Sequence, residues 1–409
     1  MLSEFLNSLA NHLVICAAKN LWRCGVLLIL CVGFLSAAWA QKPANNTLSN
    51  WSSFLTSTMA RNNPYETVLG VNNVGTMQLK WSWNAGTDRL SSPTVVDGRV
   101  YFQENTAYGG FQVLDANTGV ELWQNSTGSS SSQPAVDNGI VYYGNGWDGT
   151  VAWNAITGAL VWGFSLPYGI PESLTAVDGV AYFGTPYGGL YAVNGGQDGG
   201  QVWYDSTPSI GSTVAVVNDV VYVMEDTGDF LALDAKNGSW LWGVSLVYGG
   251  TSPAVANGTV YIGADGLYAL NATTGAMLWN YGVGMRFNTP AVANGVVFTA
   301  AGDSLYAINA TTGTLEWSTV IAGGLSAPAV ANGVVYVGTV LTYAGNKGGD
   351  SLFALNASTG EVLWSYLPKL KQDNFANVSP AVANGRVYFV CDNTSICAFG
   401  PLDEKSPAE

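Results

Sequence analysis

The sequence is poor in the side chains on which much hydrolytic and zinc chemistry depends. Of its 409 residues only one is histidine, His12, and it lies within the first 40 residues, which have the features of an export signal. Without histidine, the rest of the chain cannot form a Ser-His-Asp triad, a Cys-His pair or a histidine-ligated zinc site. Histidine-based acid–base catalysis is excluded with them.

Cysteine is scarce as well. Three of the five cysteines, Cys16, Cys24 and Cys31, fall in the first 40 residues, which leaves Cys391 and Cys397. Two thiols alone do not make a zinc or iron–sulfur site. In an oxidising compartment we expect them to form a disulfide that staples the end of the chain, the alternative being two buried thiols.

Charged residues make up only 10% of the chain, and the formal net charge is −14. Such an acidic surface repels phosphate backbones, so nucleic acid is not an expected partner. The residues that are abundant are 50 glycines and 15 tryptophans. Tight turns and large buried rings account for that mixture better than a helical bundle does.

The N-terminus predicts export. Lys19 and Arg23 precede an apolar run over 25–35, and Ala38-Trp39-Ala40 supplies a small-x-small cleavage pattern. The run is shorter than the roughly 20 residues of a membrane-spanning helix. We expect a signal peptide over 1–40 and a secreted, periplasmic or cell-surface protein. The alternative is an uncleaved anchor, the one route by which we expect contact with a membrane.

Self-similarity dominates the chain after residue 80. The unit Ser252–Trp279 recurs at Thr289–Trp317 and Ala327–Trp364, and weaker copies fill 92–123, 133–162, 173–203 and 212–242. An eighth copy begins at Ser379 and stops at Gly400 without its tryptophan strand. The missing strand, Leu-Lys-Trp-Ser-Trp, lies at 79–83. One repeat is therefore assembled from both ends of the chain.

Each repeat predicts four short strands, A to D. An Asn-Gly or Asp-Gly pair, typical of a two-residue hairpin turn, joins strands A and B, and only Asn218-Asp219 departs from this pattern. Repeats of about 40 residues with four strands are typical of propellers. The sequence thus predicts an all-β, eight-bladed β-propeller of four-stranded antiparallel blades over 79–400. An open solenoid would gain nothing from completing its last repeat with its first strand.

The parts outside the ring are short. Residues 41–78 form a polar N-terminal extension, and we expect its stretch 41–63 to be a tether; 401–409 form a charged tail. Inside the ring, one tryptophan recurs on each strand D, and we expect it to wedge between neighbouring blades. These blade-docking residues are Trp81, Trp123, Trp162, Trp203, Trp242, Trp279, Trp317 and Trp364.

A family resemblance follows from these motifs. The pattern Ala-x-Asn/Asp-x-x-Thr-Gly-x-x-x-Trp, intact in Ala269–Trp279, Ala307–Trp317 and Ala354–Trp364, resembles the tryptophan-docking repeat of pyrroloquinoline quinone (PQQ) dehydrogenases. The same repeat marks the outer-membrane protein assembly propeller and many secreted propellers. The resemblance covers roughly 79–400 and describes how blades dock, so it implies the fold more directly than an activity.

A binding site is expected on one face of the ring. The A–B and C–D turns lie on one face (the turn face), and the variable B–C and D–A segments lie on the other (the loop face). Variable loops on a rigid frame usually carry recognition. The candidate ligand-binding residues on D–A segments are Arg89, Glu172, Arg286, Asn288 and Asn377, with Glu104, Glu225 and Asp226 nearby in B–C loops.

These features favour a binding or scaffold propeller that engages a protein or small-molecule partner through its loop face, with no cofactor and no catalytic residue.

The alternative enzyme is a PQQ- and calcium-dependent alcohol dehydrogenase. For it the resemblance implies an Asp base, calcium held by Glu and Asn, an aromatic floor and often adjacent cysteines. Glu172 and Asn288 could imitate the calcium ligands, but the chain has no adjacent cysteine pair. A further alternative is an assembly scaffold, which is normally lipid-anchored, whereas Leu30 before Cys31 makes a poor lipobox.

Overall fold

The computed structural model describes residues 49–402 with internal gaps. The gaps are 87–89, 105–109, 127–131, 146–148, 167–168, 170, 172, 197, 207–208, 247–248, 322, 341–350, 369–377 and 392–393. Within the described residues, no helix is long and apolar enough to cross a membrane.

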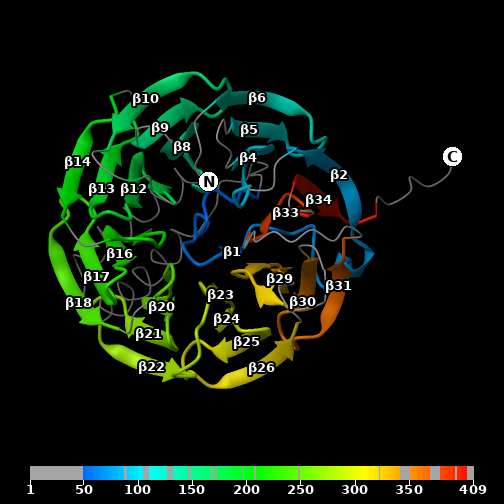
Figure 1. The fold of residues 1–409 in the computed structure, drawn as a ribbon. Coiled ribbons are helices and arrows are strands. Elements are labelled where there is room, and N and C mark those ends of the chain that lie inside the picture. The colour runs from blue at the N-terminus through cyan, green and yellow to red at the C-terminus, as the bar shows by residue number, and fades with distance from the viewer. Residues whose placement is uncertain are drawn as a thin grey trace, which may run out of the picture. The chain divides into compact units, whose positions relative to one another are not determined.

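The described chain folds into eight antiparallel sheets of four main strands each, arranged around a common centre (Figure 1). The innermost strands, A, contact one another in an unbroken circle. They are β3 (Thr94–Val96), β7 (Ala135–Asp137), β11 (Thr175–Val177), β15 (Ala215–Val217), β19 (Ala254–Ala256), β23 (Ala291–Ala293), β28 (Ala329–Ala331) and β32 (Ala381–Ala383). We number the blades 1 to 8 in this order. The predicted eight-bladed propeller is confirmed.

Strands B and C form the middle of each blade. Strands B are β4 (Arg99–Gln103), β8 (Ile140–Asn145), β12 (Val180–Gly184), β16 (Val220–Met224), β20 (Thr259–Gly263), β24 (Val296–Ala301), β29 (Val334–Val340) and β33 (Arg386–Val390). Strands C are β5 (Gly110–Asp115), β9 (Gly149–Asn154), β13 (Leu190–Asn194), β17 (Asp229–Asp234), β21 (Leu267–Asn271), β25 (Ser304–Asn309), β30 (Ser351–Asn356) and β34 (Ser395–Gly400). Their side chains are mostly buried, because each sheet packs against a neighbour on both faces.

Strands D form the outer rim. They are β6 (Glu121–Ser126), β10 (Leu160–Ser165), β14 (Gln201–Asp205), β18 (Trp240–Ser245), β22 (Met277–Tyr281), β26 (Leu315–Val320), β31 (Val362–Tyr366) and β2 (Gln78–Asn84). Three short elements complete the chain: β1 (Asn62–Asn63), β27 (Gly324–Leu325) and the 3-10 turn η1 (Val74–Thr76).

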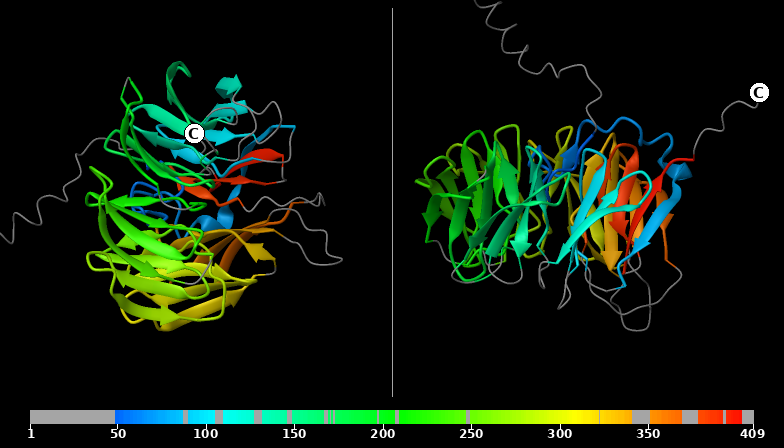
Figure 2. Two further views of the ribbon diagram at one scale, coloured as in Figure 1. Left: turned by 60° about the vertical axis from the view of Figure 1, so that its left-hand side comes forward. Right: turned by 90° about the horizontal axis from the view of Figure 1, so that it is seen from above.

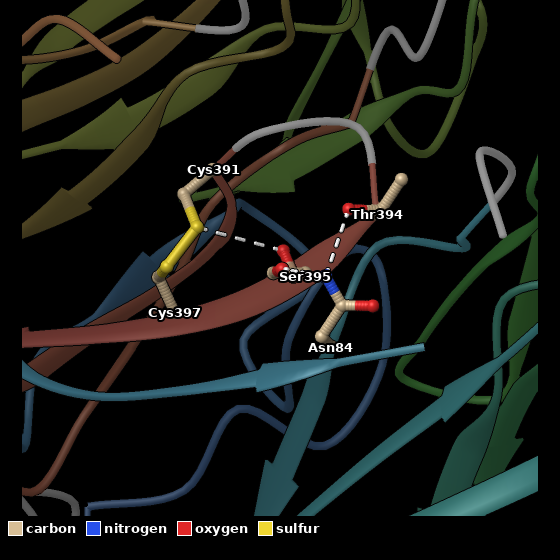
Figure 3. Close-up of a disulfide and its surroundings, with 5 residues drawn as sticks. All are labelled: Asn84, Cys391, Thr394, Ser395 and Cys397. Carbon is tan, nitrogen blue, oxygen red and sulfur yellow. Dashed lines mark hydrogen bonds between the residues drawn. A yellow bond between two sulfur atoms is a disulfide. The ribbon is translucent and has the colours of Figure 1, made fainter. Parts of the chain in front are cut away.

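The ring closes where the two ends of the chain meet. Strand β2 pairs antiparallel with β34, with Leu79 opposite Phe399, Trp81 opposite Ala398 and Trp83 opposite Ile396. An N-terminal strand thus completes the last blade, as the split repeat predicts. The disulfide Cys391–Cys397 links strand β34 to the end of β33 in the same blade, beside Asn84 of β2 (Figure 3).

The hairpin turns adopt the conformation that their sequence predicts. In the seven Asn-Gly and Asp-Gly turns, the first residue has φ between 44° and 53°, and the glycine has φ between 73° and 79°. Such left-handed values cost little for Asn, Asp and Gly. At the exception, Asn218 has φ 52° and Asp219 has φ 61°, so an aspartate occupies a position that elsewhere belongs to glycine.

Neighbouring blades are joined by a shared hydrogen-bond acceptor on the C–D turn. In five blades, the indole N–H of the strand D tryptophan and the hydroxyl of a strand B tyrosine both donate to one alanine carbonyl of the next blade, at 2.8–3.4 Å. The accepting carbonyls are those of Ala116, Ala155, Ala235, Ala272 and Ala310. Trp279 of blade 5, for example, lies 3.0 Å from Ala310 O, and Tyr261 Oη lies 3.2 Å from it.

The same turns leave room for the indole rings. A Cβ added to Gly119, Gly158, Gly199, Gly238, Gly275, Gly313 or Gly360 would come within 3.0 Å of the tryptophan of the preceding blade. Glycine is therefore required both by its positive φ and by the close approach of the ring. These contacts give the sequence motif Thr-Gly-x-x-x-Trp a physical basis.

Trp162 is the exception, and it permits a matched experiment. Its Nε1 has no acceptor in the described part of the chain, because the following C–D turn has Gly195 at the alanine position and one extra residue before Gly199. Replacing Trp279 with phenylalanine removes a hydrogen bond, and replacing Trp162 does not. We expect Trp279→Phe to lower the free energy of unfolding by about 1 kcal/mol more than Trp162→Phe, measured by urea denaturation. Equal losses would show that the indole N–H contributes nothing.

The segment from Ser49 to Leu69, which we call the strap, is packed into the ring. We expected a tether over 41–63, and for residues 49–63 this expectation is wrong. Trp51, Leu55 and Met59 are buried, and Arg61 is fully buried. In Figure 1 the strap, in blue, crosses the centre of the ring, and the right-hand view of Figure 2 places it at one face.

The strap bonds to successive innermost strands around the ring. Its carbonyls at Trp51, Ser52, Met59, Ala60 and Arg61 accept backbone N–H groups from blades 1, 2, 5, 6 and 7, at 2.8–3.0 Å. The donors are Val95, Val136, Val255, Val292 and Val330. Strand β1 adds parallel pairing with β28 of blade 7. The backbone of the strap therefore satisfies N–H groups that would otherwise face the central channel.

The two ends of the strap meet at blade 8. The Ser49 hydroxyl donates to Glu66 Oε2 at 3.0 Å, and Asn63 Nδ2 donates to Ser49 Oγ at 3.2 Å and to Val382 O at 2.8 Å. The Glu66 carboxylate also accepts the backbone N–H of Gly385 at 2.9 Å. The strap is thus a closed circle fastened to the A–B turn of the last blade, where the ring itself closes.

Candidate functional site

The strap distinguishes the two ends of the central channel. Three of its polar contacts, one each with blades 1, 7 and 8, are made to A–B turns: Asn50 bonds to Asp97, Asn332 to Leu69 O and Gly385 to Glu66. All three turns belong to the turn face. The strap therefore lies at the turn-face end, and the D–A segments surround the channel at its loop-face end.

Arg61 is a fully buried arginine in the channel, and it was not predicted from the sequence. Its guanidinium donates to three carbonyl oxygens: Nε to Pro328 at 2.8 Å, Nη1 to Phe54 at 2.5 Å and Nη2 to Ala327 at 3.4 Å. It lies over the ring of Phe54, 4.3 Å from the centroid, and 5.5 Å from that of Trp51. Burial lowers the pKa of Arg61 to about 9, which leaves the group charged at neutral pH.

The structure describes two of the five ligand-binding residues predicted on D–A segments, Arg286 and Asn288. Arg89, Glu172 and Asn377 lie outside the described residues. Arg286 is exposed on the D–A segment before blade 6. Asn288, two residues further on, is half-buried, and its Nδ2 donates to Leu325 O at 2.5 Å. The amide of Asn288 therefore ties blade 6 to blade 7, and Arg286 is the described D–A candidate whose side chain faces solvent.

Glu104 and Gln112 form a polar contact at the loop-face end of blade 1. Gln112 Nε2 donates to Glu104 Oε1 at 3.1 Å and to Gln124 Oε1 at 3.2 Å. Burial raises the pKa of Glu104, opposed by the hydrogen bond from Gln112, and Glu121 raises it further. The contact connects strand B to strands C and D of a single blade.

Asp226 and Glu225 behave differently although they are adjacent. Asp226 accepts hydrogen bonds from the Ser209 hydroxyl and from the backbone N–H of Gly211, and so braces the D–A segment before blade 4. Glu225 is buried, and its carboxylate accepts the Thr227 hydroxyl at 3.0 Å. Burial, and then the neighbouring Asp229 and Asp205, raise the pKa of Glu225.

The raised pKa of Glu225 predicts a pH-dependent stability. An acid whose pKa is higher in the folded state favours folding at low pH, and this contribution is lost as pH rises from the ordinary value of 4.5 through the raised one. We therefore expect Glu225→Gln to unfold at a higher urea concentration than the unchanged protein at pH 7. The difference should shrink as pH falls below 4.5. A pH-independent difference would contradict a titrating Glu225.

The described residues do not fit a PQQ and calcium site. They include no group of three or more His, Cys, Asp or Glu side chains that could hold a metal ion. Asn288 is bonded to a carbonyl, and both oxygens of Asp226 are engaged. The two cysteines form a disulfide with each other and are six residues apart in the sequence, not adjacent (Figure 3). Arg61, with no carboxylate bonded to it in the described chain, opposes a divalent cation in the channel.

Fold and repeats together define the class, an eight-bladed β-propeller with PQQ-like repeats. The chain belongs to the PQQ_2 family, whose model is described as outer membrane protein assembly factor BamB and matches overlapping stretches at 109–249, 187–289, 227–323 and 266–405. The resemblance noted from the docking motifs is thereby confirmed.

A curated relative gives a more distant match. Tetrathionate hydrolase from Acidithiobacillus ferrooxidans is 29% identical over 189 residues, covering 39% of this chain and 37% of that protein. The chain thus matches well under half of the relative's length.

Solved structures share the fold. BamB from Moraxella catarrhalis aligns with a TM-score of 0.63 and 16% identity, over 79% of this chain and 99% of that one. Quinohemoprotein alcohol dehydrogenase from Comamonas testosteroni aligns with a TM-score of 0.69 and 14% identity, over 88% and 82%. At such identities the likeness is one of architecture, and it does not distinguish a scaffold from an enzyme.

Proposed function

We propose that this protein is a secreted or cell-envelope binding propeller that engages a protein or small-molecule partner through its loop face. The observation that carries the proposal is the strap. It occupies the turn-face end of the channel with its own backbone, while the D–A and B–C segments at the other end differ in sequence from blade to blade. A rigid ring with one variable face suits recognition.

The second candidate is an outer-membrane assembly scaffold. It is favoured by the family model and by the alignment with BamB over nearly the whole of that protein. This candidate is a special case of the binding propeller, since it also needs a rigid ring and a protein partner. A quinone dehydrogenase has only the shared fold in its favour, because the described donor set does not suit calcium.

A pair of photo-crosslinking positions tests the binding face. A photoreactive amino acid at Arg286, exposed on the loop face, should give adducts with one envelope partner in the native cell. The same amino acid at Ser358, exposed on the turn face of blade 7, is the matched control and should not. Adducts of one partner at Ser358 and none at Arg286 would reject the loop-face proposal.

Calorimetry separates the binding propeller from the enzyme. The purified protein is titrated with PQQ in the presence of Ca²⁺ and assayed for dye-linked oxidation of a primary alcohol. We expect neither saturable binding nor turnover. Tight binding together with turnover would overturn the proposal and establish the dehydrogenase.

A further inference from the structure

Two innermost strands lack the strap. The central residues of β11 in blade 3 and β15 in blade 4 are Ala176 and Val216, which correspond to Val95 and Val255 in their pairing with strand B. In an antiparallel pair, such residues direct their N–H groups away from the neighbouring strand. In the described structure, neither Ala176 N nor Val216 N has a backbone acceptor, whereas their counterparts in blades 1, 2, 5, 6 and 7 bond to the strap. The counterpart in blade 8, Val382 N, also has none, but there the strap bonds through the Asn63 side chain to Val382 O.

The cause is a local turn in the strap. Between Ser52 and Met59 the chain bonds to itself, with Thr56 N donating to Ser53 O at 3.1 Å and Met59 N to Thr56 O at 3.2 Å. Thr56 has φ 65°, an uncommon value for a β-branched residue. Six residues, 53–58, thus pass blades 3 and 4 without pairing with them. The strap therefore gives β11 and β15 no backbone hydrogen bond at Ala176 N or Val216 N. It meets these strands through side chains instead, because Leu55 shares a buried cluster with Ala215.

A cleft lies directly beside these strands. A pocket of about 520 Å³ opens between blades 3 and 4 on the turn face, and we call it the blade 3–4 cleft. Its lining includes Val177, Asp178 and Tyr182 from blade 3, and Val216, Asp219 and Lys236 from blade 4. A second pocket of about 440 Å³ adjoins it at Asn218 and is bordered by strap residues Thr58, Ala60 and Asn62. The cleft is therefore continuous with the surface that already holds an extended segment.

The cleft carries excess negative charge. Asp178, Asp219 and Asp234 all act on the Tyr182 hydroxyl, and together with burial, the larger cause, they raise the pKa of Tyr182 to about 12. Lys236 is the one cation among the residues that line the pocket, and it pairs with Asp219 at 2.6 Å. Three carboxylates around one ammonium leave two negative charges to be balanced.

The exceptional hairpin turn belongs to this cleft. Asp219 replaces the glycine of the other seven A–B turns and holds φ 61°, a left-handed value that Asp adopts at small cost and Gly at none. Its carboxylate is two-thirds exposed at the rim. Position 219 would suit glycine at least as well, and Asp219 instead places a negative charge at the rim of the cleft.

We propose that the blade 3–4 cleft docks an extended polypeptide segment of a partner protein that carries basic side chains. The segment adds its carbonyl groups to Ala176 N and Val216 N, as the strap does at the other blades, and a Lys or Arg side chain lies among Asp178, Asp219 and Asp234. Two observations indicate the kind of partner. The strap shows that the innermost strands bond to the carbonyls of an extended segment, and the carboxylates of the cleft favour a positively charged one. This site lies on the turn face and is independent of the loop-face proposal.

The test uses a defined probe. A fluorescein-labelled, amidated hexapeptide of sequence Thr-Val-Lys-Val-Lys-Thr is titrated with the full protein at low salt and followed by fluorescence anisotropy. The same peptide with Glu in place of Lys is the charge control. We expect the basic peptide to bind at least about tenfold more tightly than the acidic one, and its affinity to fall with added salt. Hydrogen exchange of Ala176 and Val216 amides should slow when it binds.

Variants locate the site. Asp178→Asn and Asp219→Gly should each weaken the basic peptide about threefold to tenfold, and Lys236→Ala should tighten it. Asp219→Gly keeps or improves the turn, so weaker binding by this variant does not reflect misfolding. Asp303→Asn, far from the cleft at the loop end of blade 6, is the matched control and should have no effect. The proposal is overturned by equal binding of both peptides, by no binding at about 1 mM, or by unchanged exchange at Ala176 and Val216.

Discussion

Replacing Arg61 with alanine is expected to lower the free energy of unfolding by about 3–5 kcal/mol. The substitution removes a large, fully buried side chain that stacks on Phe54. It also leaves the carbonyls of Phe54, Ala327 and Pro328 without their guanidinium donor. Both losses act at the point where the strap joins blade 7, so the strap should detach before the blades separate. Urea denaturation followed by tryptophan fluorescence measures the change.

Two further variants separate packing from hydrogen bonding. Arg61→Met keeps most of the volume but no donor, and we expect an intermediate loss of about 1–3 kcal/mol. Arg286→Ala removes an exposed arginine of the same chain and should change stability by less than about 0.5 kcal/mol. A loss for Arg61→Ala no larger than that for Arg286→Ala would show that the strap is not held by this side chain in solution.

The ring itself was predictable from the sequence because its determinants are local and repeated. An Asn-Gly pair specifies a hairpin turn in each blade without reference to the rest of the chain, and the observed φ values agree. The split of one repeat between Leu79–Trp83 and the last strand predicted both closure and the number of blades. The regular recurrence of the same turn and tryptophan in eight repeats was more informative than the pattern of any single strand.

The strap could not be predicted for the opposite reason. Its apolar residues Trp51, Phe54, Leu55 and Met59 are spaced as on one face of a helix, but the segment forms turns, so this spacing does not predict its structure. The backbone hydrogen bonds that join it to the innermost strands span about 40–270 residues of sequence, and the Asn63 side chain reaches Val382, 319 residues away. A polar composition suggested a tether, whereas the polar side chains of Asn63 and Glu66 in fact point to partners inside the fold.

The loop-face candidates show a similar limit. The sequence placed Asn288 in a D–A segment correctly, but it could not show that the amide is bonded to Leu325 O of the next segment. Nor could it show that Asp226 braces Ser209 and Gly211. A polar residue in a loop is equally able to hold the loop or to meet a ligand, and only its partners in space decide between the two.

The strand B tyrosines were an unrecognised part of blade docking. The sequence predicted a role for the tryptophans, but Tyr261 reaches the same Ala310 carbonyl as Trp279. The rings of these two side chains are 5.8 Å apart, so they act on one turn from two strands of the same blade. The recurring Val-Tyr of strand B was a signal for this contact, because a buried tyrosine hydroxyl needs an acceptor.

Trp279→Ala should then lower the free energy of unfolding by about 3–5 kcal/mol, because the ring fills the space above Gly313 of the next blade and its N–H satisfies Ala310 O. The loss should be felt at a blade interface rather than within one sheet, since strand β22 keeps its pairing with β21. Stability is measured by urea denaturation, with hydrogen exchange of the C–D turn of blade 6 as a local readout.

Trp240 supplies the matched control, because it is also a tryptophan on a strand D, in β18, but is 66% exposed. Trp240→Ala should change stability by no more than about 0.5 kcal/mol. If both variants lose the same amount, the effect belongs to strand D in general and not to the ring between blades. If Trp279→Ala loses less than about 1 kcal/mol, the ring does not hold the blades together in solution, and the Thr-Gly-x-x-x-Trp motif must be explained by the turn alone.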